Sequence, residues 1–242
     1  MGTLNEKTAI VVGGGRGLGR CIALAFAREG ADVVVAARTK SQIDQVADEV
    51  RGLGRAALAV RTDAVDYEQV KKMVQETLNR FGKIEILVNC QGQGLVKPTV
   101  ETSLNEWDLV HDINLKSVFQ TCLAVLPFML KRKDGHIINI SSRVAVGGAA
   151  DAAAYAAAKA GVVALSHSLA MKFKSENIKV NVICPGPMDT GMRWKDTPDF
   201  DRRKVIKPET VAELVVLLAS WPHSVLQDPI IPASVNMLYG WD

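Results

Sequence analysis

The fold of this 242-residue chain is decided by Val11-Val12-Gly13-Gly14-Gly15-Arg16-Gly17-Leu18-Gly19 near its N-terminus. This stretch follows a short β-branched run, Thr8 to Val12, and opens an amphipathic run, Arg20 to Glu29. Glycines let the backbone turn tightly and approach a pyrophosphate, which then rests on the amide groups and positive dipole of a helix N-terminus. The spacing is G-x-x-x-G-x-G rather than the more common G-x-G-x-x-G. The strand-turn-helix context therefore predicts a phosphate-binding turn.

Similar β-branched runs recur along the chain, at Thr8 to Val12, Asp32 to Ala36, Ala56 to Arg61, Ile86 to Asn89, His136 to Ile140, Lys179 to Cys184 and Ile230 to Val235. Between them lie amphipathic stretches, one starting at the capping box Ser103-x-x-Glu106 and one at Pro208. Continuous apolar strands imply a parallel sheet covered by helices on both faces. We expect an α/β fold with a doubly wound parallel sheet of about seven strands. Without repeats or linkers, residues 1–242 should form a single domain.

The second strand-like run ends in Arg38, nineteen residues beyond Gly19 (38 − 19 = 19). About twenty residues past such a turn, a carboxylate holds the ribose 2′-hydroxyl of NAD, whereas an arginine accommodates the 2′-phosphate of NADP. No carboxylate occupies this strand end, and Lys40 and Arg16 add positive charge nearby. The sequence therefore predicts NADP(H) over NAD(H), with solvated loop charges as the alternative interpretation.

A proton-transfer site is predicted by Ser142, Tyr155 and Lys159. Tyr155 stands four residues before Lys159 in an alanine-rich helical stretch, and residues four apart share a helix face. A neighbouring ammonium favours the ionised phenol, whose unperturbed pKa of about 10 is too high for general-base work near neutrality. Ser142 follows an apolar strand and can hydrogen-bond a substrate carbonyl or hydroxyl. Together these side chains predict an acid/base site for hydride transfer.

The same Tyr-x-x-x-Lys spacing also occurs at Tyr67 and Lys71, where it predicts only a solvated helix face. The residue thirteen before Tyr67 is Gly54, which offers no hydroxyl, whereas Ser142 stands thirteen before Tyr155 (155 − 142 = 13). For Tyr155 the alternative is a buried aromatic beside a surface lysine, which the other motifs disfavour.

The order and spacing of these motifs resemble the short-chain dehydrogenase/reductase family, from about residue 5 to residue 221. Further matches are Asp63-Ala64 after the third strand, Asn89 to Gly92 after the fourth, and Pro185 to Thr190 after the sixth. The resemblance implies a Rossmann-type fold and reduction or oxidation between a ketone and a secondary alcohol. It also implies a homo-oligomer, a dimer or a homotetramer, in which the alanine-rich helix forms a contact. Simple helix propensity is the alternative explanation for those alanines.

Residue roles follow from the same resemblance. Tyr155 is expected to be the acid/base, Lys159 to lower its pKa and hold the nicotinamide ribose, and Ser142 to orient the substrate oxygen. Asn114 is expected to hold a water that relays protons towards Lys159, although local backbone capping is the alternative role for Asn114 and for Asp63. The implied cofactor contacts are Gly13, Arg16, Gly17, Leu18, Gly19, Arg38, Asp63, Ala64, Asn89, Gly92, Tyr155, Lys159, Pro185, Met188 and Thr190.

Three departures from the family pattern stand out. Val12 replaces the usual Thr before the first turn glycine, and Cys90-Gln91 stand where the family has Asn-Ala. Replacing both partners of one polar contact by less polar groups is nearly neutral, so we expect the fold to survive and Gln91 to alter the adenosine pocket. The third departure is the tail from Gln227 to Asn236, whose two prolines cannot donate to a sheet ladder.

Composition excludes several other classes. Lys and Arg total 29 and Asp and Glu total 26, without a basic stripe interleaved with aromatics, so nucleic-acid binding is not expected. Four cysteines without Cys-x-x-Cys spacing and four histidines predict neither a metal site nor a disulfide framework. Apolar runs fall short of the roughly 20 residues that span a bilayer, and the N-terminus lacks a signal core. A cytoplasmic protein without membrane contact is expected.

Substrate choice falls to the short segment Gly191 to Asp201 after the sixth strand. There Arg193 and Lys195 are either contacts for an anionic substrate or solvated charges. The length of this segment resembles 3-oxoacyl-carrier-protein reductases, so 3-oxoacyl thioesters, bound to carrier protein or to CoA, are the first candidate substrates. The alternative function is a non-catalytic NADP(H) sensor or scaffold, which has no need of a proton donor.

Overall fold

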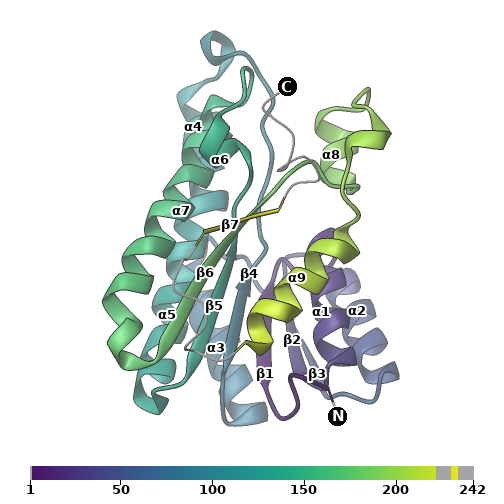
Figure 1. The fold of residues 1–242 in the computed structure, drawn as a ribbon, viewed down its shortest axis with the longest axis vertical. Coiled ribbons are helices and arrows are strands. Elements are labelled where there is room, and N and C mark those ends of the chain that lie inside the picture. The colour runs from purple at the N-terminus through teal and green to yellow at the C-terminus, as the bar shows by residue number, and fades with distance from the viewer. Residues whose placement is uncertain (1, 222–229, 234–242) are drawn as a thin grey trace.

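The computed structural model describes residues 2–221 and 230–233, and in them parallel strands form a sheet of order β3-β2-β1-β4-β5-β6-β7 (Figure 1). The strands are β1 (Thr8–Val12), β2 (Asp32–Ala37), β3 (Ala57–Arg61), β4 (Ile86–Asn89), β5 (Gly135–Ile140), β6 (Ile178–Pro185) and β7 (Ile230–Ala233). The predicted doubly wound parallel sheet is confirmed, with strand ends shifted by one or two residues. Residues 227–229 and 234–236 of the atypical tail lie outside the described residues.

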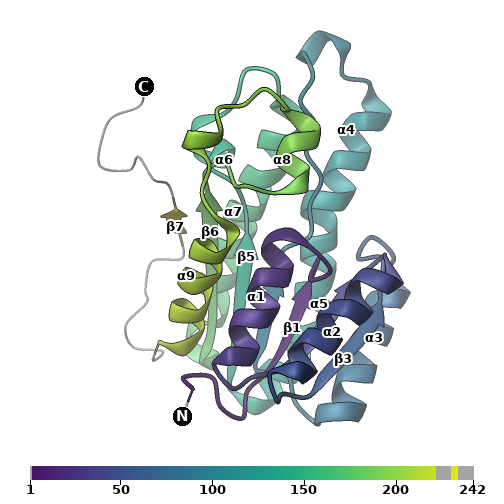
Figure 2. The same ribbon diagram turned by 90° about the vertical axis from the view of Figure 1, so that its right-hand side faces the viewer.

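Helices cover both faces of the sheet (Figures 1 and 2). They are α1 (Gly17–Arg28), α2 (Lys40–Gly52), α3 (Tyr67–Phe81), α4 (Leu104–His111), α5 (Ser117–Arg132), α6 (Val144–Gly147), α7 (Ala153–Phe173), α8 (Gly191–Asp196) and α9 (Pro208–Ser220). Helices α1, α2 and α9 pack on one face, and α3, α5 and α7 pack on the other. Strand β2 shows why its sequence is continuously apolar: Val33 and Val35 face the first layer, whereas Val34 and Ala36 face the second.

Local signals set the ends of several helices. Helix α4 begins with the predicted capping box, in which Ser103 and Glu106 satisfy each other's backbone amides. Pro208 occupies the first turn of α9, as predicted. Helix α1 begins at Gly17 rather than at Arg20, and the Arg20 amide already donates to the carbonyl oxygen of Arg16 at 3.2 Å.

A short π-helix, Asp112–Lys116, joins α4 to α5, while the 3₁₀ turns are Thr99–Glu101, Lys174–Glu176 and Arg202–Lys204. The continuous helical stretch 104–132 is long and apolar enough to cross a membrane by length and composition alone. Half of the most apolar 18-residue part of this stretch is buried inside the fold, as expected for a helix that packs on a sheet. In the sequence this stretch does not stand out as one apolar run, because Asp112 and Lys116 interrupt it.

The order in which strands are added to the sheet reverses at β1, which pairs with β2 on one side and with β4 on the other. In open α/β sheets such a reversal leaves a crevice at the carboxyl ends of the strands, where ligands bind. The loops after β1 to β6 all lie at this edge, and α8 crosses above it (Figure 1). The topology therefore brings together the motifs that the sequence scatters over nearly 180 residues (190 − 13 = 177).

Candidate active site

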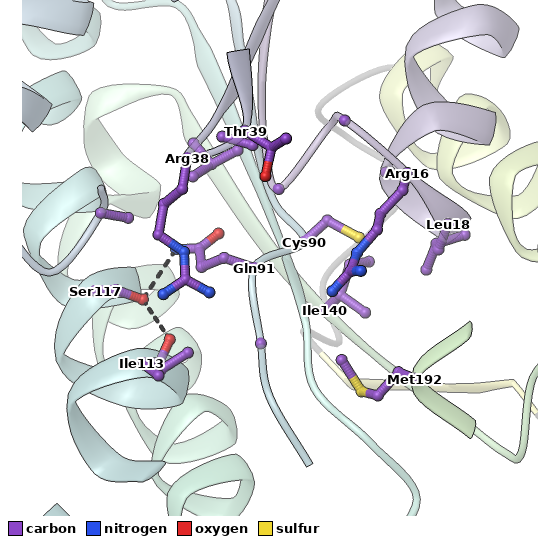
Figure 3. Close-up of a pocket in the computed structure, with 18 of the residues that line it drawn as sticks. Arg16, Leu18, Arg38, Thr39, Cys90, Gln91, Ile113, Ser117, Ile140 and Met192 are labelled. Atoms are coloured by element: carbon purple, nitrogen blue, oxygen red, sulfur yellow. Dashed lines mark hydrogen bonds between the residues drawn. The ribbon is translucent and has the colours of Figure 1, made fainter. Parts of the chain in front are cut away.

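A cavity of about 500 Å³ opens at this edge (Figure 3). Most of the predicted cofactor contacts line it, namely Gly13, Arg16, Gly17, Leu18, Gly19, Arg38, Asp63, Ala64, Gly92, Lys159, Met188 and Thr190. Five other predicted site residues are not part of the lining, namely Asn89, Asn114, Ser142, Tyr155 and Pro185. Most of the predicted cofactor contacts therefore meet at one cavity, and Tyr155 and Asn114 lie close to its lining residues Lys159 and Gly92.

The glycine turn has the geometry that phosphate binding requires. Gly13 and Gly17 adopt φ angles of 78° and 52°, a region that other residues rarely occupy. A Cβ on Gly19 would overlap the carbonyl oxygen of Gly13, so only glycine lets the helix start this close to the turn. Helix α1 has no side-chain cap, so its first amide groups are left to a ligand.

Two arginines supply positive charge to the cavity. Arg16 and Arg38 both extend into it (Figure 3), and neither forms an ion pair with any residue that the structure describes. Lys40, by contrast, is exposed and pairs with Asp44 at 2.5 Å. Asp63 lines the cavity while its Oδ1 accepts the amide of Val65, so it also has the capping role. These groups suit a ligand that carries phosphate charge beside its ribose.

Gln91 contributes to the cavity in a way that the sequence only hinted at. Its Nε2 donates to the hydroxyl of Ser117 at 3.3 Å, while its Oε1 is buried without a hydrogen-bond partner among the described residues (Figure 3). A buried orphan acceptor costs free energy, and a ligand hydroxyl or amino group removes that cost. Together with the glycine turn and the two arginines, it shows that the cleft fits a dinucleotide.

The segments that carry the first two departures lie side by side. Cys90 donates its amide to the carbonyl of Val12 at 2.9 Å, and both residues line the cavity. Burial raises the pKa of the Cys90 thiol to about 12, which keeps it protonated. The two replacements therefore leave no unpaired charge at this wall.

Asn89 does not lie along the cavity as the resemblance implied. Its side chain is fully buried, with Nδ2 donating to Asn139 Oδ1 at 2.8 Å and Oδ1 accepting from Thr121 at 2.7 Å. Asn139 in turn donates to Ser166 on α7 at 2.9 Å. The chain of hydrogen bonds ties β4, β5, α5 and α7 together beneath the site.

Lys159 is buried, with 3% of its surface exposed, at the inner end of the cavity. Its Nζ donates to the carbonyl oxygen of Ile140 at 3.0 Å and lies 5.8 Å from the centre of the Tyr155 ring. Burial lowers the pKa of Lys159 to about 8. The predicted juxtaposition of phenol and amine is therefore present, within a site that strongly disfavours charge.

The phenol pKa differs from the sequence-based expectation. Burial raises the pKa of Tyr155 to about 12, although the Ser142 hydroxyl acts in the opposite direction. The ring packs in an apolar cluster with Val110 and Ala158, which explains the desolvation. Spacing placed the amine near the ring, but its hydrogen bond goes to the carbonyl oxygen of Ile140, and burial rather than the amine decides the phenol pKa in this structure.

Asn114 lies in the π-helical turn between α4 and α5, a distortion often found at functional sites. Its amide donates to the carbonyl oxygens of Gln93 and Val110, both at 2.9 Å. A Cβ on Gly92 would come within 2.9 Å of Asn114 Oδ1 and 3.3 Å of Lys159 Nζ. The structure thus brings Asn114 and Lys159 together beside Gly92, and it also shows the capping role of Asn114.

Ser141, which the sequence analysis overlooked, positions this site. Its buried hydroxyl donates to the carbonyl oxygen of Lys159 at 2.8 Å and joins β5 to α7. Neighbouring Ser142 is partly buried and accepts the amide of Val144 at 3.4 Å. Pro185, at the end of β6, accepts the amide of Arg143 at 2.8 Å. Within the described residues, no group of His, Cys, Asp and Glu could hold a metal ion.

Comparison with known proteins identifies the protein family of this chain. Residues 7–200 match the short chain dehydrogenase family. The chain is 32% identical to the 3-oxoacyl-[acyl-carrier-protein] reductase FabG of Thermotoga maritima, covering 94% of this chain and 96% of that protein. It is 36% identical to the oxidoreductase UcpA of Salmonella typhimurium, covering 93% and 92%.

Solved structures agree with this result. A short-chain type dehydrogenase/reductase from Mycobacterium marinum superimposes with a TM-score of 0.91 at 29% identity, covering 98% of this chain and 97% of that one. Levodione reductase gives a TM-score of 0.89 at 26% identity, covering 96% and 98%. The chain belongs to the short-chain dehydrogenase/reductase family. It is an oxidoreductase of the kind that uses a nicotinamide dinucleotide, NAD(P)(H).

Proposed function

We propose that this protein is an NADP(H)-dependent ketoreductase that interconverts a ketone and a secondary alcohol. The observation that carries the proposal is the buried Lys159, whose amine is held by Ile140 beside the Tyr155 ring at the inner end of the cleft. A buried amine with one neutral acceptor is costly for stability, and such groups concentrate at functional sites. Arg38 and Arg16, unpaired within the described residues, support the preference for NADP(H).

The residues of the chain have distinct roles in this reaction. Arg16, Arg38 and the first amides of α1 would hold the cofactor's phosphates, and Lys159 its nicotinamide ribose. The bound nicotinamide supplies or accepts the hydride. Ser142 orients the substrate oxygen, and Tyr155 donates a proton to that oxygen during reduction. Lys159, with its pKa near 8, exchanges protons readily at neutral pH and can resupply the phenol, with Asn114 holding the loop beside it.

The raised phenol pKa favours one direction. With a pKa of about 12, Tyr155 is protonated at neutral pH and is ready to act as a general acid. Oxidation of an alcohol needs the ionised phenol, which is scarce at that pH. We therefore infer that carbonyl reduction reaches its full rate near neutrality, whereas alcohol oxidation becomes faster as the pH rises.

For the substrate, 3-oxoacyl thioesters bound to carrier protein or CoA are the first candidates, supported by the likeness to the Thermotoga maritima enzyme. A homo-oligomer, dimer or tetramer, is supported by large apolar side chains exposed on α4, α5 and α7, among them Leu109, Phe119, Leu123 and Met171. A cytoplasmic location completes the proposal.

The test combines cofactor titration with a substrate panel. Fluorescence titration should show NADPH binding at least tenfold more tightly than NADH, and a panel of ketones and 3-oxoacyl thioesters should then oxidise NADPH. Equal affinity for NADH would overturn the cofactor assignment. Tight NADPH binding without turnover of any carbonyl would instead favour a sensor or scaffold on the same fold.

A further inference from the structure

Helix α8 forms the roof of the site above the carboxyl edge of the sheet (Figure 2). Its base is tied down, because Trp194 Nε1 donates to Asp189 Oδ1 at 2.6 Å and Met188 forms a β-bridge with Ile206. Its end is closed by Thr197, whose amide donates to the carbonyl oxygen of Arg193 at 2.8 Å. The last residue of α8, Asp196, is therefore held in place rather than free to swing into solvent.

Asp196 reaches across to the loop that follows β4. A Cβ added to Gly94 would overlap Asp196 Oδ2, so the carboxylate lies directly over the Gly94 backbone. Two residues earlier in the same loop, Gly92 lies against the side chains of Asn114 and Lys159. The carboxylate thus borders the space next to the proton-transfer residues, and glycine at position 94 is what allows its approach.

Asp196 has no direct partner, although the charges of Lys195 and Arg193 act on it from a distance and oppose the effect of burial on its pKa. Within residues 2–221 and 230–233, no group donates a hydrogen bond to it and no cation lies within 4.0 Å of it. Arg193 is turned away, with Nη1 donating to Thr197 Oγ1 at 2.9 Å and its guanidinium 4.8 Å from the Phe200 ring centre. Partial burial raises the pKa of Asp196, and its charge also acts to raise the pKa of Tyr155, in line with its contact with the loop beside the proton-transfer residues.

We propose that Asp196 is a specificity-determining residue that accepts a hydrogen bond from a hydroxyl or ammonium group carried next to the carbonyl of the substrate. A half-buried carboxylate without a partner costs free energy, and a donor on the substrate removes that cost. A plain alkyl chain leaves the carboxylate unsatisfied, and an anionic group beside the carbonyl is repelled. The inference rests on the proposed carbonyl reduction, and it favours ketones with a donor beside the carbonyl over the plain 3-oxoacyl thioesters named first above.

Three ketones of equal size test the idea: aminoacetone, hydroxyacetone and butanone, each reduced with NADPH. The wild-type kcat/KM should be about 10- to 100-fold higher for the two donor-bearing ketones than for butanone, the range expected for a hydrogen bond to a charged group. Asp196→Asn should remove most of this preference by raising KM. The kcat/KM for aminoacetone should fall more than the kcat/KM for hydroxyacetone. NADPH affinity, measured by fluorescence titration, should stay within about twofold of the wild type.

Two further variants sharpen the test. Asp199→Asn removes an exposed carboxylate from the same segment. It should leave the ratios of kcat/KM among the three ketones unchanged. Gly94→Ala displaces the Asp196 carboxylate, so it should cause the same loss as Asp196→Asn, and the double variant should lose no more than either single variant. Additive losses, or a preference that survives in Asp196→Asn, would overturn the inference while leaving the ketoreductase assignment intact. Absence of any carbonyl turnover by the wild type would overturn both.

Discussion

The substitution Asn89→Ala distinguishes the two roles that Asn89 can have. The structure places its side chain in a buried network, hydrogen-bonded to Asn139 at 2.8 Å and to Thr121 at 2.7 Å. Removing the amide leaves Asn139 Oδ1 buried without its donor, which costs about 1–3 kcal/mol, and it opens a small cavity. We expect a total loss of about 2–4 kcal/mol in the free energy of unfolding.

Urea denaturation followed by circular dichroism measures this loss, with Asn79→Ala as the matched control. Asn79 is exposed on α3, so its removal should cost less than about 0.5 kcal/mol. Because Asn89 does not line the cavity, NADPH affinity of the folded variant should change by less than about threefold. Unchanged stability together with a tenfold weaker NADPH affinity would refute this account, and would place Asn89 along the adenosine instead.

Three further predictions concern the cleft. Arg38→Asp should weaken NADPH binding at least tenfold and leave NADH binding nearly unchanged in an equilibrium titration; an equal loss for both cofactors would show that Arg38 does not meet the 2′-phosphate. Gly19→Ala should abolish cofactor binding because its Cβ overlaps Gly13, and retained affinity would argue against the phosphate turn. Alcohol oxidation should accelerate as pH rises towards the Tyr155 pKa of about 12, because the base is the ionised phenol, whereas reduction should stay constant near neutrality; a pH-independent oxidation rate would contradict that assignment.

Local patterns made much of the cleft predictable. Gly13, Gly17 and Gly19 are required by backbone geometry that other residues rarely tolerate, so their spacing after a strand is informative by itself. Tyr155 and Lys159 share a helix face for the same kind of local reason. Because parallel strands bring their carboxyl ends to one edge, the sheet prediction also placed these motifs together correctly.

Long-range packing explains what the sequence could not supply. Whether Asn89 points to the cavity or to α5 depends on the pleat of β4 and on its partner Asn139 in β5, which are far apart in the sequence. The phenol pKa is set by burial among residues of α4 and α7, which outweighs the nearby amine. The contact of Asp196 with Gly94 joins segments that are about a hundred residues apart in the sequence, and no local sequence pattern predicts it.

The substitution Tyr155→Phe tests most directly whether the phenol transfers the proton. NADPH affinity should match the wild type in a fluorescence titration, because the ring and its apolar packing remain. Single-turnover reduction of the best ketone should then be slower by about 10²- to 10⁴-fold, the usual contribution of a general acid. Reduction at the wild-type rate with NADPH fully bound would contradict the account.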